Sequence, residues 1–495
     1  MDAFPETVPD LLAWRASREP ARPWLFFEGQ SWTLGDVQRE VDRHAVGLAE
    51  RGVVHGDRVA ILLGNRPETL FTWFATNRLG AIAAMLNPAH KHGELVALFR
   101  LMAPRVVVTD EHRALVEAAL AELPAEGRAA IVSSAELPTS GEPPSVVVAP
   151  DDVCVLIATS GTTGAPKAVM QTHRTYTLTA ESFPSWLGLT DADRLLATLP
   201  FFHINAQAYS TMAALACGSL AIQRRFSASR FWEEARELGA TQFNSVGAML
   251  HIMLRTPPRP ADREHRIRTC YAALALPEAT HRAFEERFGL ALTVGYGMSE
   301  TTFGTVWPLG APAHYGTMGR LRQHPRLGEI NRARVVTDDG SDTPAGENGE
   351  LWLSNPGTMA GYWRDPGQTA TALHDGWLHT GDVVRRDADG YFTFVSRKKD
   401  VIRRRGENIS AVEIENALAS FAGVREVAVI GVASDLGEED VVAYVAPEAG
   451  VSLDLAALTA WARERLADFK VPQVIHVREA LPRTATERIA KHLLK

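Results

Sequence analysis

Cysteine is scarce in this chain: Cys154, Cys217 and Cys270 are the only three among 495 residues. None forms a Cys-x-x-Cys pair, and none belongs to a His/Cys cluster with the spacing of a zinc site. Their largely apolar neighbours predict buried thiols in a reducing compartment. A disulfide-stapled fold is therefore excluded, and no structural zinc site is expected.

The chain also lacks a surplus of basic residues and a long apolar run. Lys and Arg number 51 against 59 Asp and Glu, a net charge of −8, so no nucleic-acid partner is expected. The longest apolar stretch, residues 206–222, is too short and too polar to span a bilayer. The first residues, MDAFPETVPDLLAWR, lack the basic start and apolar run of a signal peptide. We predict a cytoplasmic monomer or homodimer with no membrane partner.

What is present is an ordinary globular composition, 46% hydrophobic and 22% charged. Short apolar runs such as 59–63 and 81–86 alternate with helical spacing, as over 67–79, which is typical of parallel, helix-covered sheets. A similar region runs from about 195 to 294. We predict an α/β fold: a large N-terminal domain of two helix-covered sheets plus a small β-barrel-like unit, then a small mobile α+β C-terminal domain.

The predicted domain boundaries follow changes in the sequence pattern. After Gly310, short strands alternate with Gly, Asp and Pro turns, so a β unit at about 310–395 completes a large domain of residues 1–396. The charged segment 397–400 lies between two strand-rich regions and is the candidate boundary. Residues 401–495 form the predicted small domain.

The first motif, residues 159–167, directly follows the apolar run 153–158. Its glycines let backbone amides approach a phosphate, its hydroxyls add donors and Lys167 adds a compact positive charge. It is not a Walker loop, because Pro166 interrupts it and the next residues look extended. A polar hairpin between strands is the alternative. The residues that we assign to phosphate binding are Thr159, Ser160, Gly161, Thr162, Thr163, Gly164 and Lys167.

Five further motifs follow: PFFH (200–203), GYGMSET (295–301), WLHTGD (377–382), RKKDVIRRR (397–405) and PRTATERI (482–489). Together the six motifs resemble, in order, those of the adenylate-forming superfamily of acyl-CoA synthetases, nonribosomal-peptide adenylation domains and luciferases. The resemblance covers nearly the whole chain. Within the superfamily, the sequence looks most like ligases akin to crotonobetaine/carnitine–CoA ligase.

The GYGMSET motif combines glycines that allow close approach to a flat base with an aromatic face on Tyr296 and a carboxylate on Glu300. A strand-to-helix turn capped by Ser299 is the alternative. The resemblance implies that Tyr296 packs on adenine, that Glu300 holds Mg²⁺ with Thr163, and that Thr301 touches the α-phosphate. The remaining ATP-binding residues of this segment are Gly297, Met298 and Ser299.

The WLHTGD motif ends in Asp382, which could mark a simple turn, because Asp after Gly is common there. Its carboxylate could equally accept both ribose hydroxyls, as in dinucleotide enzymes. The resemblance implies this second role, with Arg397 beside Asp382.

The PFFH motif ends in His203, and a lone histidine beside aromatic residues is usually a satisfied core residue. The resemblance implies instead that His203 opens and closes the pocket for the acid between two half-reactions. The residues that we assign to this pocket are small or polar without fixed charge, which favours a modest polar or aromatic acid: His203, Asn205, Gln207, Asn244, Ser245, Gly295 and Gly297.

The basic run at 397–405 would ordinarily be a solvated surface. The resemblance assigns its start to a hinge, with Lys399 and Asp400, about which the small domain swings between two poses. Gly406, Glu407 and Asn408 then form the loop that faces the acid site where a pantetheine arm enters.

The last motif departs from the superfamily pattern. Glu487 stands where glycine is usual, and Arg488 stands where a lysine bridges the acid and the α-phosphate. Arginine can supply the charge through a bidentate fork, and the role is electrostatic. Lys491 is the fallback, about one turn away if this tail is helical. Ala168 also replaces a usual glycine.

The sequence therefore predicts ATP-dependent activation of a small carboxylic acid as an acyl-adenylate, with transfer to CoA, through Lys167, His203, Glu300 and Arg488. ATP and Mg²⁺ are the expected cofactors, and CoA is the expected co-substrate. Three alternatives stay open. In the first, the acyl group is transferred to a carrier-protein pantetheine or to an amine instead of CoA. In the second, the enzyme activates nitrite with ATP and diazotises an aromatic amine. In the third, the protein is a non-catalytic nucleotide binder. The intact phosphate loop, Glu300 and Asp382 argue against the last.

Overall fold

The structure, a computed structural model, describes residues 3–125, 128–160, 166–273, 275–398, 401–404, 407–433, 439–466, 468–484 and 488–494. The chain divides into two compact units. Unit 1 comprises Met1–Ala333 and Leu353–Leu378, and unit 2 comprises Arg334–Trp352 and His379–Lys495. The predicted boundary at 397–400 lies inside unit 2, and its last two residues lie outside the described part of the chain, so it stays a prediction.

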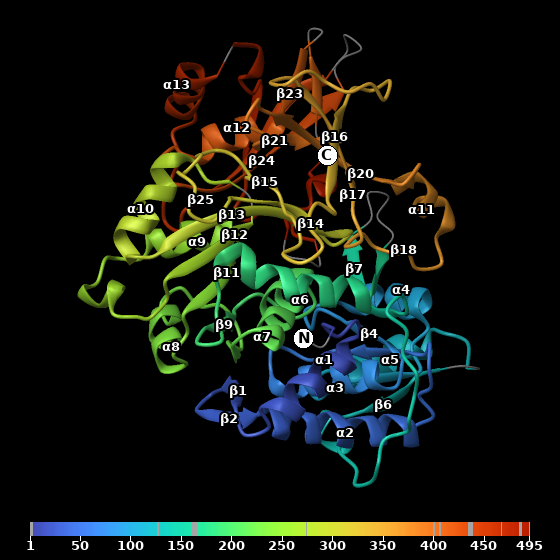
Figure 1. The fold of residues 1–495 in the computed structure, drawn as a ribbon. Helices are drawn as coiled ribbons and strands as arrows, with labels where there is room; N and C mark the ends of the chain where they lie inside the picture. The colour runs from blue at the N-terminus through green and yellow to red at the C-terminus, as the bar shows by residue number, and fades with distance from the viewer. Residues whose placement is uncertain are drawn as a thin grey trace. The chain divides into compact units, whose positions relative to one another are not determined.

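Unit 1 contains a seven-stranded sheet in the order β18-β8-β7-β4-β3-β5-β6 (Figure 1). Its central strands pair in parallel, as predicted, whereas β8 and β18 are antiparallel to their neighbours. The strands are β3 (Arg58–Ile61), β4 (Ile82–Met85), β5 (Val106–Val108), β6 (Ala130–Val132), β7 (Val153–Ser160), β8 (Pro166–Thr172) and β18 (Gly361–Tyr362).

A nine-stranded sheet of unit 1 has the order β15-β14-β13-β12-β11-β9-β10-β1-β2. It is parallel from β1 to β13 and ends in antiparallel strands at both edges. The strands are β1 (Pro23–Phe27), β2 (Gln30–Thr33), β9 (Arg194–Ala197), β10 (Ser219–Ile222), β11 (Gln242–Val246), β12 (Thr269–Ala273), β13 (Ala291–Met298), β14 (Thr301–Val306) and β15 (Arg320–Leu321). The two predicted sheets are confirmed.

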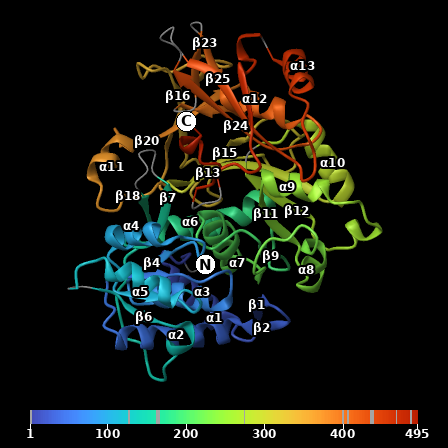
Figure 2. The same cartoon turned by 180° about the vertical axis from the view of Figure 1, so that it is seen from behind.

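Helices cover both faces of the seven-stranded sheet because successive strand residues point to opposite sides. Val59 and Ile61 of β3 pack in one core with α1, α2 and α3, whereas Ala60 packs in another with α4 and α5. Figure 2 labels these five helices. The helices of unit 1 are α1 (Val8–Arg18), α2 (Leu34–Glu50), α3 (Pro67–Arg78), α4 (His92–Met102), α5 (Arg113–Ala121), α6 (His173–Leu187), α7 (Ala213–Ala216), α8 (Phe231–Glu237), α9 (Gly247–Arg255), α10 (Glu278–Phe288) and α11 (Pro366–Ala372).

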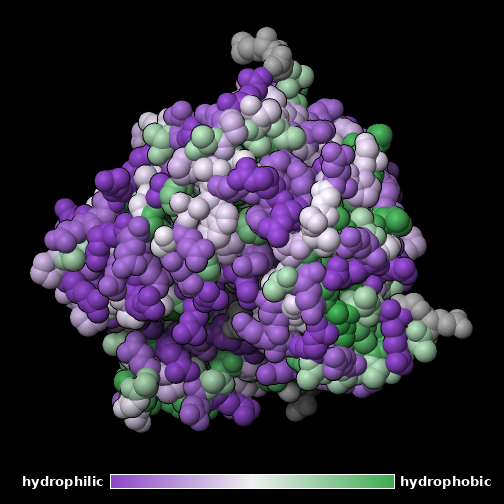
Figure 3. Space-filling model, turned by 90° about the horizontal axis from the view of Figure 1, so that it is seen from below, coloured by the Kyte–Doolittle hydropathy of each residue, from purple (hydrophilic) through white to green (hydrophobic). Residues whose placement is uncertain are grey.

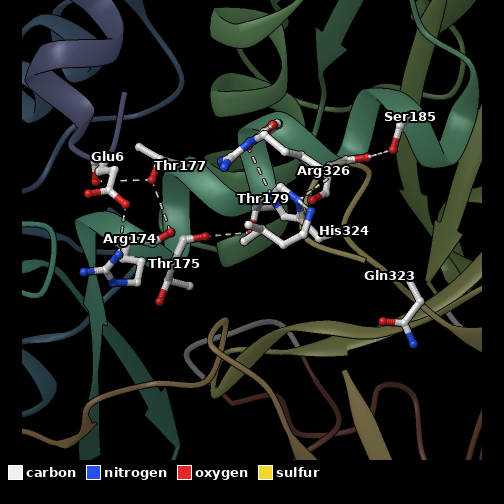
Figure 4. A network of polar contacts seen from close by, with 12 residues as sticks. Glu6, Arg174, Thr175, Thr177, Thr179, Ser185, Gln323, His324 and Arg326 are labelled. Carbon is white, nitrogen blue, oxygen red and sulfur yellow. Dashed lines mark hydrogen bonds and ion pairs between the residues drawn. The ribbon is translucent and has the colours of Figure 1, made fainter. Parts of the chain in front are cut away.

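Helix α6 directly follows β8 and connects to the other sheet through its side chains (Figure 4). Thr179 Oγ1 donates to Thr302 Oγ1 on β14 at 2.8 Å, and Arg326 pairs with Glu181 at 2.8 Å. At the start of the helix, Arg174 pairs with Glu6 at 3.2 Å. The helix therefore couples the strand after the phosphate loop to β14.

The first residue of α6 makes the stability of unit 1 sensitive to acid. His173 is fully buried and accepts a hydrogen bond from the Val8 N–H at Nδ1, at 3.2 Å. Burial lowers its pKa from 6.5 to about 4, against a smaller opposing effect of Asp152. The unfolded chain therefore binds a proton between about pH 6.5 and 4 that the folded chain excludes, so stability falls as pH falls through this window. At 1.36 kcal/mol per unit, the loss is about 3 kcal/mol.

We expect the thermal midpoint of the protein to fall between pH 7 and pH 4.5 by more than that of His173→Asn, whose side-chain oxygen takes the place of Nδ1 as the acceptor for the Val8 N–H. Both proteins are measured by circular dichroism in matched buffers. Equal pH dependence in the two would show that His173 does not carry this loss.

A third sheet has the order β16-β17-β20-β19, with β21 paired to β20. Strand β19 of this sheet belongs to unit 1. Unit 2 contains a three-stranded sheet and two helices that share one core, as predicted for the small α+β domain. The elements are β16 (Arg332–Val336), β17 (Asn348–Ser354), β19 (Leu373–His374), β20 (Trp377–Arg386), β21 (Phe392–Arg397), β22 (Val401–Arg404), β23 (Glu407–Ser410), α12 (Ala411–Ala419), β24 (Val424–Ala433), β25 (Glu439–Pro447), α13 (Leu455–Arg465) and β26 (Val474–Val477).

The surface turned to the viewer in Figure 3 is covered mainly by hydrophilic side chains, with apolar residues in small groups. Among the described residues, no helix is long and apolar enough to cross a membrane. The three cysteines are free thiols; Cys154 and Cys270 are buried as expected, and Cys217 is half-buried.

Candidate active site

The predicted phosphate loop connects two antiparallel strands. Thr159 on β7 pairs with Lys167 on β8, and Ser160 pairs with Pro166. The predicted loop residues Gly161, Thr162, Thr163 and Gly164 lie outside the described residues. The predicted extended course after Lys167 is confirmed, because β8 runs to Thr172. The connection is thus a hairpin, as in the alternative interpretation, and Lys167 is the second residue of its second strand. Its role in phosphate binding stays a prediction.

Ala168 shows why the departure from glycine is accommodated. Its side chain is fully buried in the core beneath α4 and α5. Its carbonyl accepts a hydrogen bond from the Trp363 N–H at 2.8 Å. The methyl group adds to a packed core and leaves the backbone free to pair with the segment that follows β18.

Glu300 lies in the tight turn of a second hairpin. Met298 on β13 pairs with Thr301 on β14, which leaves Ser299 and Glu300 as the turn. The alternative of a strand-to-helix turn is therefore wrong, since the chain continues as a strand. Gln171 Nε2 of β8 donates to the Ser299 carbonyl at 2.5 Å, and the Glu300 carbonyl accepts from the Met359 N–H at 2.8 Å. These bonds hold the second hairpin beside the first. The contact of α6 with β14 does the same.

Tyr362, which the sequence reasoning missed, joins the two hairpins. It pairs with Val169 of β8, and its hydroxyl donates to Glu300 Oε1 at 2.9 Å. The Lys167 Nζ lies 5.0 Å from the centre of the Tyr362 ring and 2.7 Å from Gln368 Oε1. The structure therefore brings the predicted phosphate-binding cation and the predicted metal-binding carboxylate to one aromatic ring.

The Glu300 carboxylate fits a magnesium ion that is held mainly by phosphates. Mg²⁺ in nucleotide sites takes one or two carboxylates together with phosphate oxygens and water. Among the described residues, no group of three or more His, Cys, Asp or Glu could hold a metal by itself. Half-buried Glu300 is suited to one coordination position; the second predicted ligand, Thr163, lies outside the described residues.

The predicted pocket residues Asn205 and Asn244 contact each other, although 39 positions separate them. Asn244 Nδ2 donates to Asn205 Oδ1 at 2.8 Å and to Ser210 Oγ at 3.1 Å. Asn205 begins a π-helix, η2 (Asn205–Met212), an irregular helix type that is frequent at functional sites. Asn244 lies on β11, where Ser245 follows, fully buried. The structure therefore unites these predicted residues at the end of β11.

Gln207 belongs to a different network from Asn205. It is buried, accepts a hydrogen bond from the Tyr176 hydroxyl and donates to the Phe201 carbonyl at 2.5 Å. His203 is half-buried just before η2, with its ring 4.5 Å from that of Phe202. Gln207 thus holds the PFFH turn against α6.

The glycines of β13 permit close approach of aromatic side chains. A methyl group on Gly297 would lie 2.6 Å from Tyr209 Oη, and one on Gly295 would lie 2.6 Å from the Tyr271 ring. Behind them lies Arg322, fully buried, which donates to Tyr209 Oη at 2.8 Å and to Tyr271 Oη. The sequence reasoning missed this guanidinium, so a fixed charge does lie behind Gly295 and Gly297, two of the uncharged residues predicted for the pocket. Only the fold reveals it, since 113 positions separate Arg322 from Tyr209.

In unit 2, Asp382 is fully buried inside β20, and its carboxylate lies 2.6 Å from Arg397 Nε on β21. The two residues are paired directly across the strands. The alternative of a simple turn is wrong, because Asp382 is a strand residue. Arg397 lies beside Asp382 as expected, and the ribose-binding role of the two residues stays a prediction.

The predicted hinge and loop are described only in part. Lys399, Asp400 and Gly406 lie outside the described residues. The backbone of Glu407 and Asn408 forms the start of β23, which pairs with β22. Their predicted roles stay predictions.

Arg488 and Lys491 differ in their surroundings within unit 2. Arg488 is exposed, and its carbonyl accepts from the Thr484 N–H at 2.7 Å. Lys491 Nζ forms an ion pair with Glu415 at 2.8 Å. Lys491 begins a 3₁₀ helix, η6 (Lys491–Leu493), that does not include Arg488, so the helical relation between the two is wrong. Glu487 lies outside the described residues.

The chain is similar in sequence to two family models and to curated CoA ligases. The model of the family "AMP-binding enzyme" matches residues 12–363, and that of the "AMP-binding enzyme C-terminal domain" matches residues 413–488. Crotonobetaine/carnitine–CoA ligase of Escherichia coli O45:K1 is 32% identical over 492 residues, 93% of this chain and 92% of the relative. The ligase of that name from Salmonella typhimurium is 31% identical, over 94% of this chain and 93% of its own.

The fold of the chain is similar to solved structures over nearly its full length. The anthranilate CoA ligase AuaEII in complex with anthranoyl-AMP has a TM-score of 0.88 at 25% identity, covering 100% of this chain and 97% of its own. The o-succinylbenzoate CoA synthetase of Bacillus subtilis in complex with its acyl-adenylate has a TM-score of 0.87 at 27% identity, covering 98% of each chain.

Proposed function

Because the chain belongs to the AMP-binding enzyme family, we propose that it activates a small carboxylic acid with ATP as an acyl-adenylate and transfers the acyl group to CoA. It is an adenylate-forming ligase. The observation that carries the proposal is the convergence of Lys167 and Glu300 on Tyr362, within 5.0 Å and 2.9 Å respectively. A cation and a carboxylate at one point suit a phosphate–magnesium complex.

In the first step, the acid's carboxylate oxygen attacks the α-phosphorus of ATP, and pyrophosphate leaves. Lys167 and the loop amides bind the phosphates, and Thr301 contacts the α-phosphate. Glu300 would hold Mg²⁺, which supplies positive charge at the phosphate oxygens. Tyr296 packs on the adenine. Arg488 offsets the negative charge that develops at the reacting phosphate.

In the second step, the CoA thiol attacks the acyl carbon, the bond to the phosphate oxygen breaks, and AMP leaves. A swing of the small domain about Lys399 and Asp400 brings Gly406, Glu407 and Asn408 to the acid site. His203 opens and closes the pocket between the two steps. The basic run that ends at Arg405 offers positive charge for CoA phosphates.

The acid itself is small and polar or aromatic. Asn205 and Asn244 offer amide groups, and the exposed backbone of Gly297 lets a flat group lie against β13. Tyr209 and Arg322 close the far side with polar atoms, which disfavours a long alkyl chain. Two structural relatives are ligases of aromatic acids, by the names anthranilate and o-succinylbenzoate.

We expect pyrophosphate release that depends on one class of carboxylic acid, followed by AMP and an acyl-CoA product when CoA is present. The purified protein is incubated with MgATP and panels of aromatic, short polar and fatty acids, with and without CoA, and products are identified by mass. Lys167→Ala, prepared in parallel, controls for contaminating activity.

Other outcomes select the alternatives. Pyrophosphate release with nitrite, and diazotised product from an aminoaromatic acid, would replace the carboxylate by nitrite. Adenylate that forms but never reaches CoA would point to a carrier protein or an amine as acceptor. No release with any acid would contradict the proposal and favour a nucleotide binder.

A further inference from the structure

Tyr362 contacts two residues of the predicted ATP site through different parts of its side chain. Its hydroxyl donates to Glu300 Oε1 at 2.9 Å, and its ring lies 5.0 Å from the Lys167 ammonium. The three residues come from three segments, β8, the β13–β14 turn and β18. One side chain therefore touches both the proposed metal ligand and the proposed phosphate ligand.

The backbone around Tyr362 is held on both sides. Its N–H donates to Thr369 Oγ1 at 2.9 Å, and Thr369 Oγ1 donates to the Asp365 carbonyl at 2.8 Å. Gly361 has φ of +131°, and a methyl group there would lie 2.7 Å from the Thr369 side chain, so only glycine fits. These contacts fix the backbone position of Tyr362.

Gln368 completes the arrangement. Its N–H donates to Asp365 Oδ1 at 2.9 Å, which fixes the first turn of α11, and its side-chain oxygen accepts from Lys167 at 2.7 Å. An amide oxygen at this distance occupies the position that a phosphate oxygen takes on an ammonium group. The Lys167 ammonium is thereby held between the Tyr362 ring and the Gln368 side-chain oxygen.

Two physical effects follow from these contacts. Partners that hydrogen-bond a metal-binding carboxylate orient it and tune its affinity. An aromatic face attracts an ammonium group and restricts its position. We propose that Tyr362 is a positioning residue that orients Glu300 for Mg²⁺ through its hydroxyl and Lys167 for phosphate through its ring, while Gln368 holds Lys167 until phosphate replaces it. This inference rests on the proposed function for the identity of the ligands.

The test separates the hydroxyl from the ring by binding measurements without turnover. Mn²⁺ replaces Mg²⁺ and is followed by electron paramagnetic resonance in the presence of α,β-methylene-ATP, which cannot release pyrophosphate. Tyr362→Phe is expected to weaken Mn²⁺ binding about 10- to 100-fold, with nucleotide affinity at saturating Mn²⁺ nearly unchanged. Tyr362→Leu is expected to weaken nucleotide affinity at saturating Mn²⁺ as well, by roughly 3- to 30-fold.

Two controls keep the result interpretable. Tyr315→Phe alters another tyrosine whose ring lies against a basic residue, Arg282 at 4.7 Å, and is expected to bind like the parent. The circular dichroism and thermal midpoint of each variant exclude misfolding.

Gln368→Ala is expected to leave Mn²⁺ affinity unchanged and to speed nucleotide association, because no side chain competes for Lys167.

Three results would overturn the inference in different ways. Parent-like Mn²⁺ affinity in folded Tyr362→Phe would refute the role of the hydroxyl. Equal nucleotide affinity in the Phe and Leu variants would refute the role of the ring. If the parent itself bound no Mn²⁺–nucleotide complex, the ATP assignment would be wrong, and the proposed function would fail together with this inference.

Discussion

Replacing Arg488 by alanine is expected to slow adenylate formation by about 10²- to 10³-fold, the usual effect of removing one preorganised donor to a developing negative charge. Replacing Lys491 by alanine is expected to change this rate little. A smaller effect is expected at Lys491 because its ammonium group is already paired with Glu415 at 2.8 Å. The role needs charge and not proton transfer, so Arg488→Lys should retain most of the activity.

The measurement is acid-dependent exchange of labelled pyrophosphate into ATP, with the acid that the panel identifies. It reports the first step alone and is independent of CoA. Loss of exchange in Lys491→Ala with normal exchange in Arg488→Ala would transfer the role to Lys491. Parent-like exchange in both variants would show that neither residue supplies the charge.

The second large effect is expected at Asp382. If its carboxylate accepts both ribose hydroxyls, Asp382→Ala loses two hydrogen bonds to a charged acceptor, each worth about 1.5–3 kcal/mol. ATP affinity should therefore fall by roughly 10²- to 10⁴-fold. The residue is suited to the role because it is buried and already oriented by Arg397 Nε at 2.6 Å.

Deoxynucleotides distinguish this role from a merely structural one. The parent should bind 2′-deoxy-ATP and 3′-deoxy-ATP much more weakly than ATP, whereas Asp382→Ala should bind all three alike, as measured by titration calorimetry. Asp382→Asn keeps the shape of the side chain and is the second variant in case alanine impairs folding. Equal discrimination by parent and variants would mean that Asp382 does not contact the ribose.

The candidate site residues could be proposed from the sequence because they lie in short contiguous segments. The phosphate loop ends in Lys167 on a strand, and Glu300 follows two glycines that must lie close to aromatic rings. Asp382 and Arg397 were also predicted as partners, and they pair across β20 and β21. The prediction that Lys491 lies one helical turn from Arg488 was wrong, because a 3₁₀ helix begins only at Lys491.

The sequence by itself determined the two helix-covered sheets and the order of the motifs, because strand periodicity and residue types are local properties. The reaction class followed from the family that those motifs resemble. Only the tertiary structure decided which distant side chains contact the candidate site residues. Tyr362 reaches Glu300 across 62 positions, Gln368 reaches Lys167 across 201, and Arg322 reaches Tyr209 across 113. Such contacts depend on which strands pair and in which register, and a single chain's residue pattern carries no signal for pairings at that separation.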